Sequence, residues 1–155
     1  MWILLILILL FLFMQMSDNK RNTLAIVVNK WLPGIQAAAT NYGVPWTRVA
    51  AIVATESGGN ESARNGLSIG LMQIEPIALQ DFNSEYHTSY SIESLNDPGI
   101  NMNVGTGYLA LLRKRLNNDL DLATQAYNGG IGNVLKDNSF DRVYLTRVKE
   151  FEQYL

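Results

Sequence analysis

The 155-residue chain is predicted to be all-α, with one helical domain preceded by a single hydrophobic N-terminal helix. Apolar residues recur at the three- and four-residue spacing of helices along most of the chain, and no segment alternates as a strand does. A chain of this length supports one domain, because domains span about 100–200 residues. We expect a hydrophobic membrane anchor at 1–16, a linker at 17–22 and the domain at 23–155.

The N-terminal segment is apolar without interruption from Trp2 to Met14, and no charged side chain precedes Asp18. A helix from Trp2 to Met16 is about 22 Å long at ~1.5 Å per residue, which is shorter than a ~30 Å hydrocarbon core. We expect an uncleaved single-pass anchor. A signal peptide remains an alternative, although a basic start and an A-x-A-like site are missing. A core helix, apolar on every face, is the third alternative.

Composition excludes several classes of function. The 12 basic and 14 acidic residues give a net charge of −2, without the basic excess that nucleic-acid binding favours. Cysteine is absent and there is one histidine, so a zinc site would lack its usual ligands. We therefore expect no nucleic-acid partner, no metal and no organic cofactor.

The first two helices of the domain are expected on either side of Pro33-Gly34. Before it, apolar residues follow the helical spacing i, i+3, i+4, i+7, and the second helix repeats that spacing from Ile35 to Tyr42, where Gly43 ends it. Pro45 is expected to open the third helix at its first turn. The apolar face of the first helix is formed by Leu24, Val27, Val28 and Trp31, and that of the third by Trp46, Val49, Ala50 and Val53.

The second half of the chain alternates loops with helices. A loop of small residues is expected at 57–69, and a helix then spans residues 76–82. After a polar loop, helical periodicity returns at 100–115 and at 122–127, where Asn128-Gly129-Gly130 interrupts it. The last helix is expected over residues 140–151.

Glu56 stands out because of its surroundings. The apolar run 46–55 leads into it, and the small residues 57–59 follow at once. An apolar environment raises the pKa of a carboxylic acid, because it disfavours the ionised form. A raised pKa suits an acid that must protonate a leaving group at neutral pH.

Four short motifs follow one another along the chain. They are Glu56-Ser57 with Gly70-Leu71-Met72-Gln73-Ile74-Glu75-Pro76; Asp97-Pro98 with Asn101, Gly105 and Tyr108-Leu109; Ala126-Tyr127-Asn128-Gly129-Gly130; and Tyr144-Leu145 with Val148. In this order they resemble the motifs of lytic transglycosylases, the peptidoglycan-cutting enzymes of bacteria and phages, and the resemblance covers residues 41–151. The resemblance implies a goose-type-lysozyme-like helical domain.

The resemblance implies that Glu56 is the catalytic residue. It would protonate the glycosidic oxygen and then, as a carboxylate, accept a proton from the C6 hydroxyl of N-acetylmuramic acid (MurNAc). The bond to N-acetylglucosamine (GlcNAc) would break and leave a 1,6-anhydro end. The implied substrate-binding residues are Gln73, Tyr127, Asn128, Tyr144, Met72 and Glu75.

The resemblance also suggests how these residues act. Gln73 would line the sugar cleft, Tyr127 would offer a ring to a sugar face, and Asn128 would offer an amide to an N-acetyl group. Tyr144 would hydrogen-bond the Glu56 carboxyl group. Glu75 stands where the family commonly has methionine, and Phe140 with Asp141 occupies a turn where many members carry an acidic residue.

Three other functions remain open. A goose-type-lysozyme-like muramidase would hydrolyse the same bond with a water held by Glu61, Glu75 or Asp81. A non-catalytic, glycan-binding structural component would not need an acid in an apolar site. The run 66–70 also matches the G-x-S-x-G elbow of serine hydrolases, which requires a preceding strand and a catalytic histidine; we expect the single histidine, His87, to be a solvated loop residue.

A small domain behind a bare anchor suits local perforation of the cell wall. The expected setting is a phage entry or virion component, or a secretion or conjugation apparatus. The expected partners are peptidoglycan glycan strands, the membrane and such a complex. The expected location is a bacterial inner membrane with a periplasmic domain, or a virion membrane. Lys20 and Arg21 would instead favour a cytoplasmic domain by the positive-inside rule.

Overall fold

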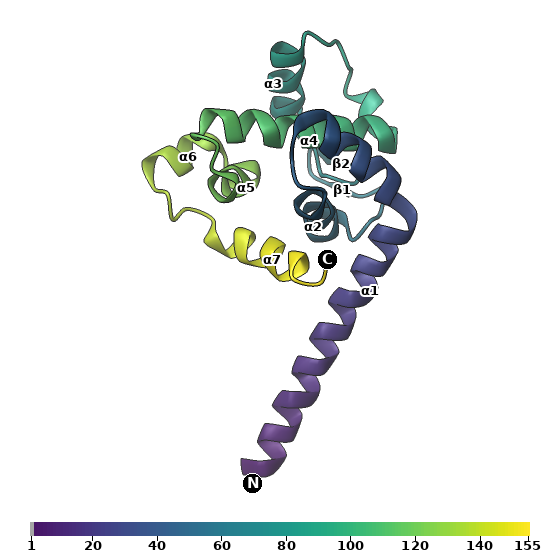
Figure 1. Cartoon of the computed structure of the whole chain (residues 1–155), viewed down its shortest axis with the longest axis vertical. Coiled ribbons are helices and arrows are strands. Elements are labelled where there is room, and N and C mark those ends of the chain that lie inside the picture. Colours follow the sequence, from purple (N-terminus) through teal and green to yellow (C-terminus); the bar gives the residue numbers. More distant parts are fainter. Residues whose placement is uncertain (1) are drawn as a thin grey trace.

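The computed structural model describes the backbone of residues 2–155 and the side chains of residues 18–155. The first element, α1, is one helix of 41 residues, Trp2–Tyr42, whose C-terminal part packs against the rest of the domain (Figure 1). The side chains of the anchor expected at 1–16 lie outside the described residues. Within the described part, no helix has the length and apolar character needed to cross a membrane.

Two expected interruptions of α1 are wrong. The linker expected at 17–22 is helical, and the helix continues through Pro33. A proline inside a helix removes one hydrogen bond, but Val27 before it and Ile35 after it are both fully buried, so one apolar face runs past this point. Gly34 serves a close contact instead, because a Cβ there would lie 2.5 Å from Met102 Cε.

The remaining helices largely follow the predicted order. They are α2 (Trp46–Ser57), α3 (Pro76–Tyr86), a 3-10 turn η1 (Glu93–Asn96), α4 (Pro98–Arg115), α5 (Leu120–Gly129), α6 (Ile131–Lys136) and α7 (Arg142–Glu152). The expectation of a purely helical protein needs one correction, because β1 (Arg64–Asn65) and β2 (Ser68–Ile69) form an antiparallel hairpin. Two-residue strands are too short to leave an alternating pattern. Helix α6 was not expected, and α7 begins two residues after Phe140.

Local capping explains two of these helix starts. The Asp97 carboxylate accepts a hydrogen bond from the Ile100 backbone N–H at 2.8 Å, and Asp119 does the same for Leu122 at 2.9 Å. Such N-caps satisfy backbone donors that have no partner within the helix. Pro98 occupies the first turn of α4, where its missing N–H is harmless.

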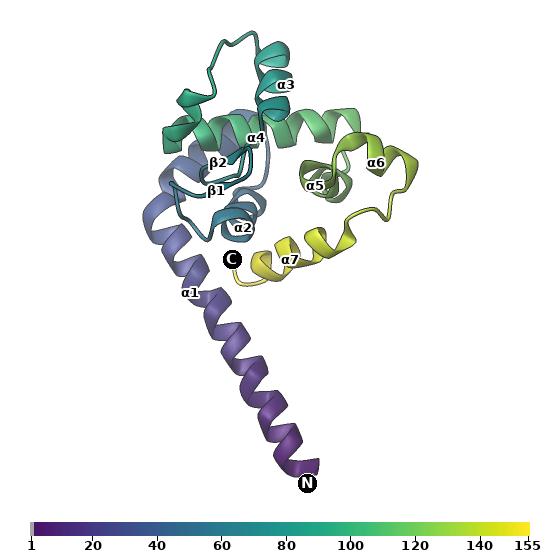
Figure 2. The ribbon, with the colours of Figure 1, turned by 180° about the vertical axis from the view of Figure 1, so that it is seen from behind.

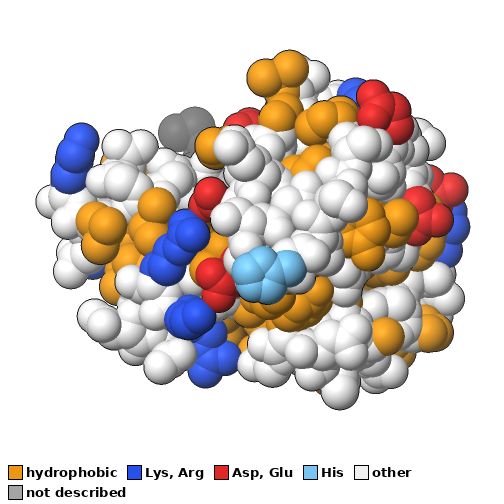
Figure 3. Space-filling view, turned by 90° about the horizontal axis from the view of Figure 1, so that it is seen from above, with side chains coloured by type: hydrophobic (Ala, Val, Ile, Leu, Met, Phe, Trp, Pro, Cys, Tyr) orange, Lys and Arg blue, Asp and Glu red, His pale blue; other side chains and the backbone are white. Residues whose placement is uncertain are grey.

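Helix α4 runs through the centre of the domain and packs against α1, α3 and α5 (Figures 1 and 2). Two glycines allow neighbours to approach it closely. A Cβ at Gly105 would lie 2.6 Å from Met72 Sδ, and one at Gly107 would lie 2.3 Å from the Phe82 ring. Figure 3 shows that apolar side chains on one outer face form several separate groups.

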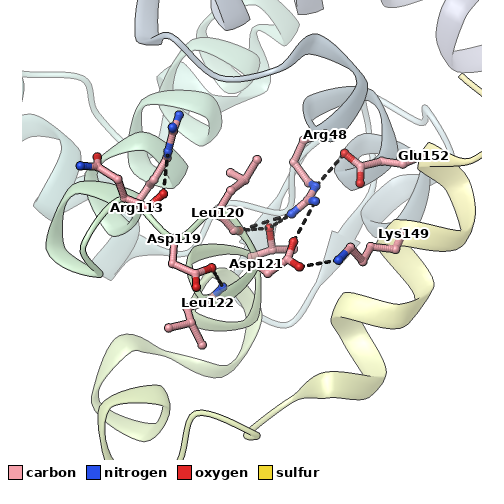
Figure 4. A network of polar contacts seen from close by, with 10 residues as sticks. Arg48, Arg113, Asp119, Leu120, Asp121, Leu122, Lys149 and Glu152 are labelled. Atoms are coloured by element: carbon pink, nitrogen blue, oxygen red, sulfur yellow. Dashed lines mark hydrogen bonds and ion pairs between the residues drawn. The ribbon is translucent and has the colours of Figure 1, made fainter.

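A buried arginine joins three helices, α2, α5 and α7. Arg48 of α2 is 5% exposed, and its guanidinium contacts Asp121 of α5 at 3.0 Å and Glu152 of α7 at 2.7 Å (Figure 4). It also donates to Thr124 Oγ1 at 2.7 Å. Lys149 pairs with Asp121 from the other side. Each charge in this group therefore has a partner, as burial requires.

Candidate active site

Glu56 lies in the last turn of α2, partly buried, and accepts a hydrogen bond from the Tyr144 hydroxyl of α7 at 2.6 Å on Oε1. This is the contact that the resemblance implied. The pKa of Glu56 is raised, chiefly because burial disfavours the carboxylate, while the Tyr144 hydrogen bond and the charge of Arg147 lower it. The charges of Asp141 and Glu75 raise it further. The site therefore holds a carboxylic acid that retains its proton to a higher pH than usual.

The end of α2 is fixed by its small residues. Gly58 adopts a left-handed conformation (φ 61°), and its N–H donates to the Ala54 carbonyl at 3.2 Å, which terminates the helix. The Ser57 hydroxyl donates to the Leu71 carbonyl at 2.8 Å. The Glu-Ser pair is thus bonded to the segment that carries Gln73, and the two parts of the first motif form one structure.

A cleft of about 540 Å³ opens beside Glu56. Its walls come from the end of α2, the β1–β2 hairpin, the start of α3 and the end of α5. Four of the six predicted substrate-binding residues line it together with Glu56: Gln73, Glu75, Tyr127 and Asn128. The other two, Met72 and Tyr144, are buried beside it.

Gln73 is held in an unusual conformation. Its backbone has a positive φ of 48°, and its side-chain Nε2 donates to the carbonyls of Ala63 at 3.1 Å and Gly70 at 2.8 Å. Both amide hydrogens therefore have partners within the protein. Only the amide oxygen remains to accept a hydrogen bond in the cleft.

Tyr127 presents its ring rather than its hydroxyl. The hydroxyl donates to the Met72 carbonyl at 2.8 Å, and the ring lies 5.8 Å from that of Tyr108, centroid to centroid. Burial, with a smaller contribution from the charge of Glu56, raises the pKa of Tyr127 well above its usual value. This phenol therefore stays neutral and does not act as a base.

Two predicted substrate contacts need correction. The Met72 side chain is fully buried, and its sulfur accepts a hydrogen bond from the Thr106 hydroxyl at 3.8 Å, so it forms part of the core beneath the cleft. Tyr144 is 2% exposed and reaches Glu56 rather than the cleft surface. Its hydroxyl instead donates a hydrogen bond to the Glu56 carboxyl group.

Asn101 belongs to a recognised motif, but the sequence did not indicate its role. It is fully buried, its Oδ1 accepts from the Met72 N–H at 2.9 Å, and its Nδ2 donates to the Ile69 carbonyl at 2.8 Å. A Cβ at Gly70 would lie 2.4 Å from Asn101 Nδ2, so only glycine fits beside it. This asparagine holds the Gly-Leu-Met-Gln turn on α4.

The β1–β2 hairpin contributes residues to the cleft that the sequence did not predict. Arg64, Asn65 and Ser68 line the cleft, and so do Ile77 and Tyr108. Arg64 is the only cation among the lining residues within the described part of the chain. Because β1 and β2 have two residues each, no periodicity could have placed these side chains in the same cleft as Glu56.

The structure separates the three carboxylates that could hold a water. Glu61 pairs with Lys30 at 2.5 Å, Asp81 pairs with Arg115 at 2.8 Å, and neither lines the cleft. Only Glu75 does. It accepts a hydrogen bond from the Ser68 hydroxyl at 3.4 Å.

The serine-hydrolase alternative lacks its histidine. Ser68 lines the cleft, but His87 is exposed at the C-terminal end of α3 and does not (Figure 3). Within residues 18–155, no group of histidine and acidic side chains is arranged to hold a metal ion. The arrangement instead provides one partly buried acid and an open, mainly polar cleft.

Comparisons with known proteins show the family to which the chain belongs. The profile of the family described as "Transglycosylase SLT domain" matches residues 33–146. Two similar relatives are both named membrane-bound lytic murein transglycosylase C. The protein of Yersinia enterocolitica is 32% identical over 129 residues, which is 74% of this chain and 35% of that protein. The protein of Shigella sonnei is 34% identical over 131 residues, which is 77% of this chain and 36% of that protein.

Solved structures show the same fold. The lytic transglycosylase Slt of Pseudomonas aeruginosa matches with a TM-score of 0.66 and 25% identity, over 81% of this chain and 22% of that one. The 70-kDa soluble lytic transglycosylase of Escherichia coli matches with a TM-score of 0.65 and 26% identity, over 80% of this chain and 22% of that one. The chain spans about a third of the length of the curated relatives that it matches.

Proposed function

The chain belongs to the transglycosylase SLT domain family, and on this premise we propose that it is a peptidoglycan lytic transglycosylase. It cleaves the β-1,4 bond between MurNAc and GlcNAc and leaves 1,6-anhydro-MurNAc ends. One observation carries the proposal: Glu56, whose pKa is raised by burial, lies at a cleft with its carboxyl group held by Tyr144. No cofactor takes part in this chemistry.

A single carboxyl group performs both proton transfers in the proposed reaction. Glu56 gives its proton to the glycosidic oxygen as the bond from that oxygen to C1 of MurNAc breaks. The resulting carboxylate then takes the proton of the C6 hydroxyl, whose oxygen bonds to C1. Glu56 ends protonated, as it began, and no water is consumed. The Tyr144 hydrogen bond favours the carboxylate that exists between the two steps.

The cleft-lining residues supply binding in this proposal. Gln73 accepts a hydrogen bond from the substrate through its amide oxygen, because its nitrogen is already bonded within the protein. Tyr127 offers its ring to a sugar face, and Asn128 offers an exposed amide to an N-acetyl group. Glu75 places a second carboxylate beside the sugar.

Product analysis in ¹⁸O-water tests the proposed reaction. An anhydro end is about 18 Da lighter than the reducing end that hydrolysis leaves, since water is the difference between the two routes. Intramolecular attack by the C6 hydroxyl benefits from high effective molarity, so we expect unlabelled anhydro ends almost exclusively. New reducing ends that carry ¹⁸O would contradict the lyase assignment.

Hydrolysis is the second candidate, and Glu75 is the one residue that favours it. It is the only other carboxylate that lines the cleft within the described residues. If ¹⁸O-labelled ends dominate and Glu75→Gln abolishes them, the chain is a muramidase. A non-catalytic glycan-binding component would yield neither product.

We also propose that the protein associates with a membrane. Its relatives are named membrane-bound, and residues 1–16 are apolar enough to serve as a single-pass anchor for the domain at 23–155. A domain tethered in this way suits local perforation of the wall by a virion, secretion or conjugation complex. The full chain should remain in the membrane fraction after a carbonate wash, and its recovery in the wash would contradict the anchor.

A further inference from the structure

An exposed aromatic side chain stands beside the cleft and has no part in the proposed reaction. Phe140 lies in the loop between α6 and α7, and 40% of its surface is exposed. Its ring packs on Gly129, where a Cβ would lie 2.7 Å from the Phe140 Cε1. Gly129 is flanked by Asn128 and Gly130, which both line the cleft. The ring therefore lies next to the α5 end of the cleft, just outside the residues that line it.

The loop holds Phe140 in a defined position. Gln125 of α5 is 3% exposed, and its amide, with the nitrogen turned toward the loop, donates to the carbonyl of Phe140 at 2.5 Å and that of Asn138 at 3.2 Å. The Phe140 N–H donates to the Asp137 carbonyl at 2.9 Å. A buried polar side chain thus fixes the backbone beneath an exposed ring.

The same loop faces the catalytic centre. The residue after Phe140 is Asp141, which has a positive φ of 61° and immediately precedes α7. Its charge is among the causes that raise the pKa of Glu56, so the loop lies within electrostatic reach of the acid. Tyr144 follows on α7 and bonds Glu56 directly.

We propose that Phe140 is a sugar-stacking residue that extends the cleft by a further glycan-binding position beyond Asn128-Gly129-Gly130. The inference rests on the proposed function, because it takes the occupant of the cleft to be a glycan strand. Sugar rings carry faces of C–H groups, which pack on aromatic rings through apolar contact and dispersion. A glycan is the occupant because the ring packs on Gly129, whose two neighbours line the cleft that the strand would occupy. The position sets a preference for longer strands.

Kinetics on long strands and on the shortest glycan that the enzyme cleaves test this role. Phe140→Ala should raise KM for long strands about three- to tenfold, with kcat unchanged and with no effect on the shortest substrate. Phe140→Trp should restore the wild-type KM. Val143→Ala is the matched control, since it removes an apolar side chain that is 72% exposed and lies one turn away. Equal KM values for Phe140→Ala and wild type would overturn the inference.

Direct binding supplies the second measurement. In the Glu56→Gln variant, which should bind without cutting, Phe140→Trp places a fluorescent ring at the position, and Glu56→Gln alone is its control. Long strands should change the added fluorescence, and the shortest glycan should not. No change with either glycan would overturn the inference, and so would an equal change with both.

The two proposals fail in distinguishable ways. If the wild-type enzyme produces no anhydro ends, the proposed function fails. If it produces them and Phe140→Ala cuts long strands as well as wild type does, only the sugar-stacking role fails. An equal loss of affinity in Phe140→Ala and Val143→Ala would indicate a general apolar contact, such as a protein partner, and would also overturn it.

Discussion

Partial burial of Glu56 raises its pKa, which suits the proposed acid catalysis but lowers the stability of the folded protein at neutral pH. Replacing it with glutamine keeps its shape but removes the acid, and general acid–base catalysis contributes roughly 10²–10⁴-fold. We expect Glu56→Gln to lower the rate of peptidoglycan cleavage by roughly 10²-fold or more. The helical circular dichroism of the variant should be unchanged. Near-normal cleavage by a folded variant would contradict the assignment.

The same substitution should change how stability depends on pH. The pKa of Glu56 is raised from 4.5 in the folded protein, so the unfolded chain releases this proton at a lower pH than the folded chain does. Wild-type stability is therefore lost as pH rises from 4.5 through the folded pKa. Glu56→Gln lacks this loss. Its melting temperature should exceed that of wild type at neutral pH, and the difference should shrink below pH 4.5. A pH-independent difference would contradict the burial of this charge.

Gln73 provides a test of hydrogen-bond direction. Its nitrogen donates to two carbonyls, so Gln73→Glu would place a carboxylate oxygen against two acceptors. We expect the substitution to destabilise the protein by about 1–3 kcal/mol and to abolish cleavage. Asn65→Asp makes the same chemical change in an exposed residue of the same cleft and should leave stability within about 0.5 kcal/mol. Equal effects in urea unfolding would refute the assigned orientation.

The residues that the sequence identified best were those with chemistry of their own. Glu56 and Tyr144 were paired from their motifs, and the structure contains their hydrogen bond. Met72 was misplaced because a motif gives the order of residues but not the side to which each points. The backbone turn at Gln73 sends neighbouring side chains in different directions, and its positive φ cannot be read from a glutamine.

At the scale of elements, the long apolar faces were predictable and the short segments were not. Helices α2 and α4 follow from periodicity, caps and prolines. Helix α6 has six residues and the hairpin strands two each, so neither provides a repeating pattern. The hairpin nevertheless supplies one wall of the cleft. Helix α6 leads into the loop that contains Phe140.

The Arg48 group should determine how firmly α2, α5 and α7 hold together. Arg48→Met would leave the carboxylates of Asp121 and Glu152 without this cation in a largely buried place. Breaking a buried pair destabilises by ~3–5 kcal/mol, and we expect a value near the lower end because the Asp121 side chain is 39% exposed and keeps Lys149. Urea unfolding of the wild type and of Arg48→Met measures this loss of stability.

Lys30→Met is the matched control for that measurement. It breaks the pair with Glu61, in which both side chains are at least 39% exposed, and should change stability by less than about 1 kcal/mol. An Arg48→Met variant no less stable than Lys30→Met would show that the buried group does not join the helices.

At the scale of the whole molecule, α1 is both the N-terminal segment and part of the core. The sequence predicted a boundary after residue 22, because polar residues there resemble a linker. The structure instead continues one helix through them, and Lys20 of this stretch pairs with Glu150 of α7. Charged residues on a helix that packs against a domain are indistinguishable, in sequence, from charged residues in a linker.

Two truncated chains should therefore behave differently. A chain that starts at Ser17 keeps every buried residue of α1 within the described part, beginning with Leu24, and should be soluble and cut isolated peptidoglycan at the full-length rate. A chain that starts at Leu32 loses Leu24 and Val27 from the core. It also loses Trp31, whose Nε1–H donates to the Gly59 carbonyl at 2.9 Å and so supports the loop directly after Glu56.

Truncating a buried leucine lowers the free energy of unfolding by about 2–5 kcal/mol, and folded domains are stable by only about 5–15 kcal/mol. Losing both residues together with the Trp31 contact should unfold the shorter chain or abolish its activity. Circular dichroism and peptidoglycan cleavage, measured on both chains, separate these cases. If the chain that starts at Leu32 folds and cuts normally, α1 does not support the site. If the chain that starts at Ser17 fails to fold, the domain depends on residues before the first buried contact, and the boundary between anchor and domain lies earlier than Ser17.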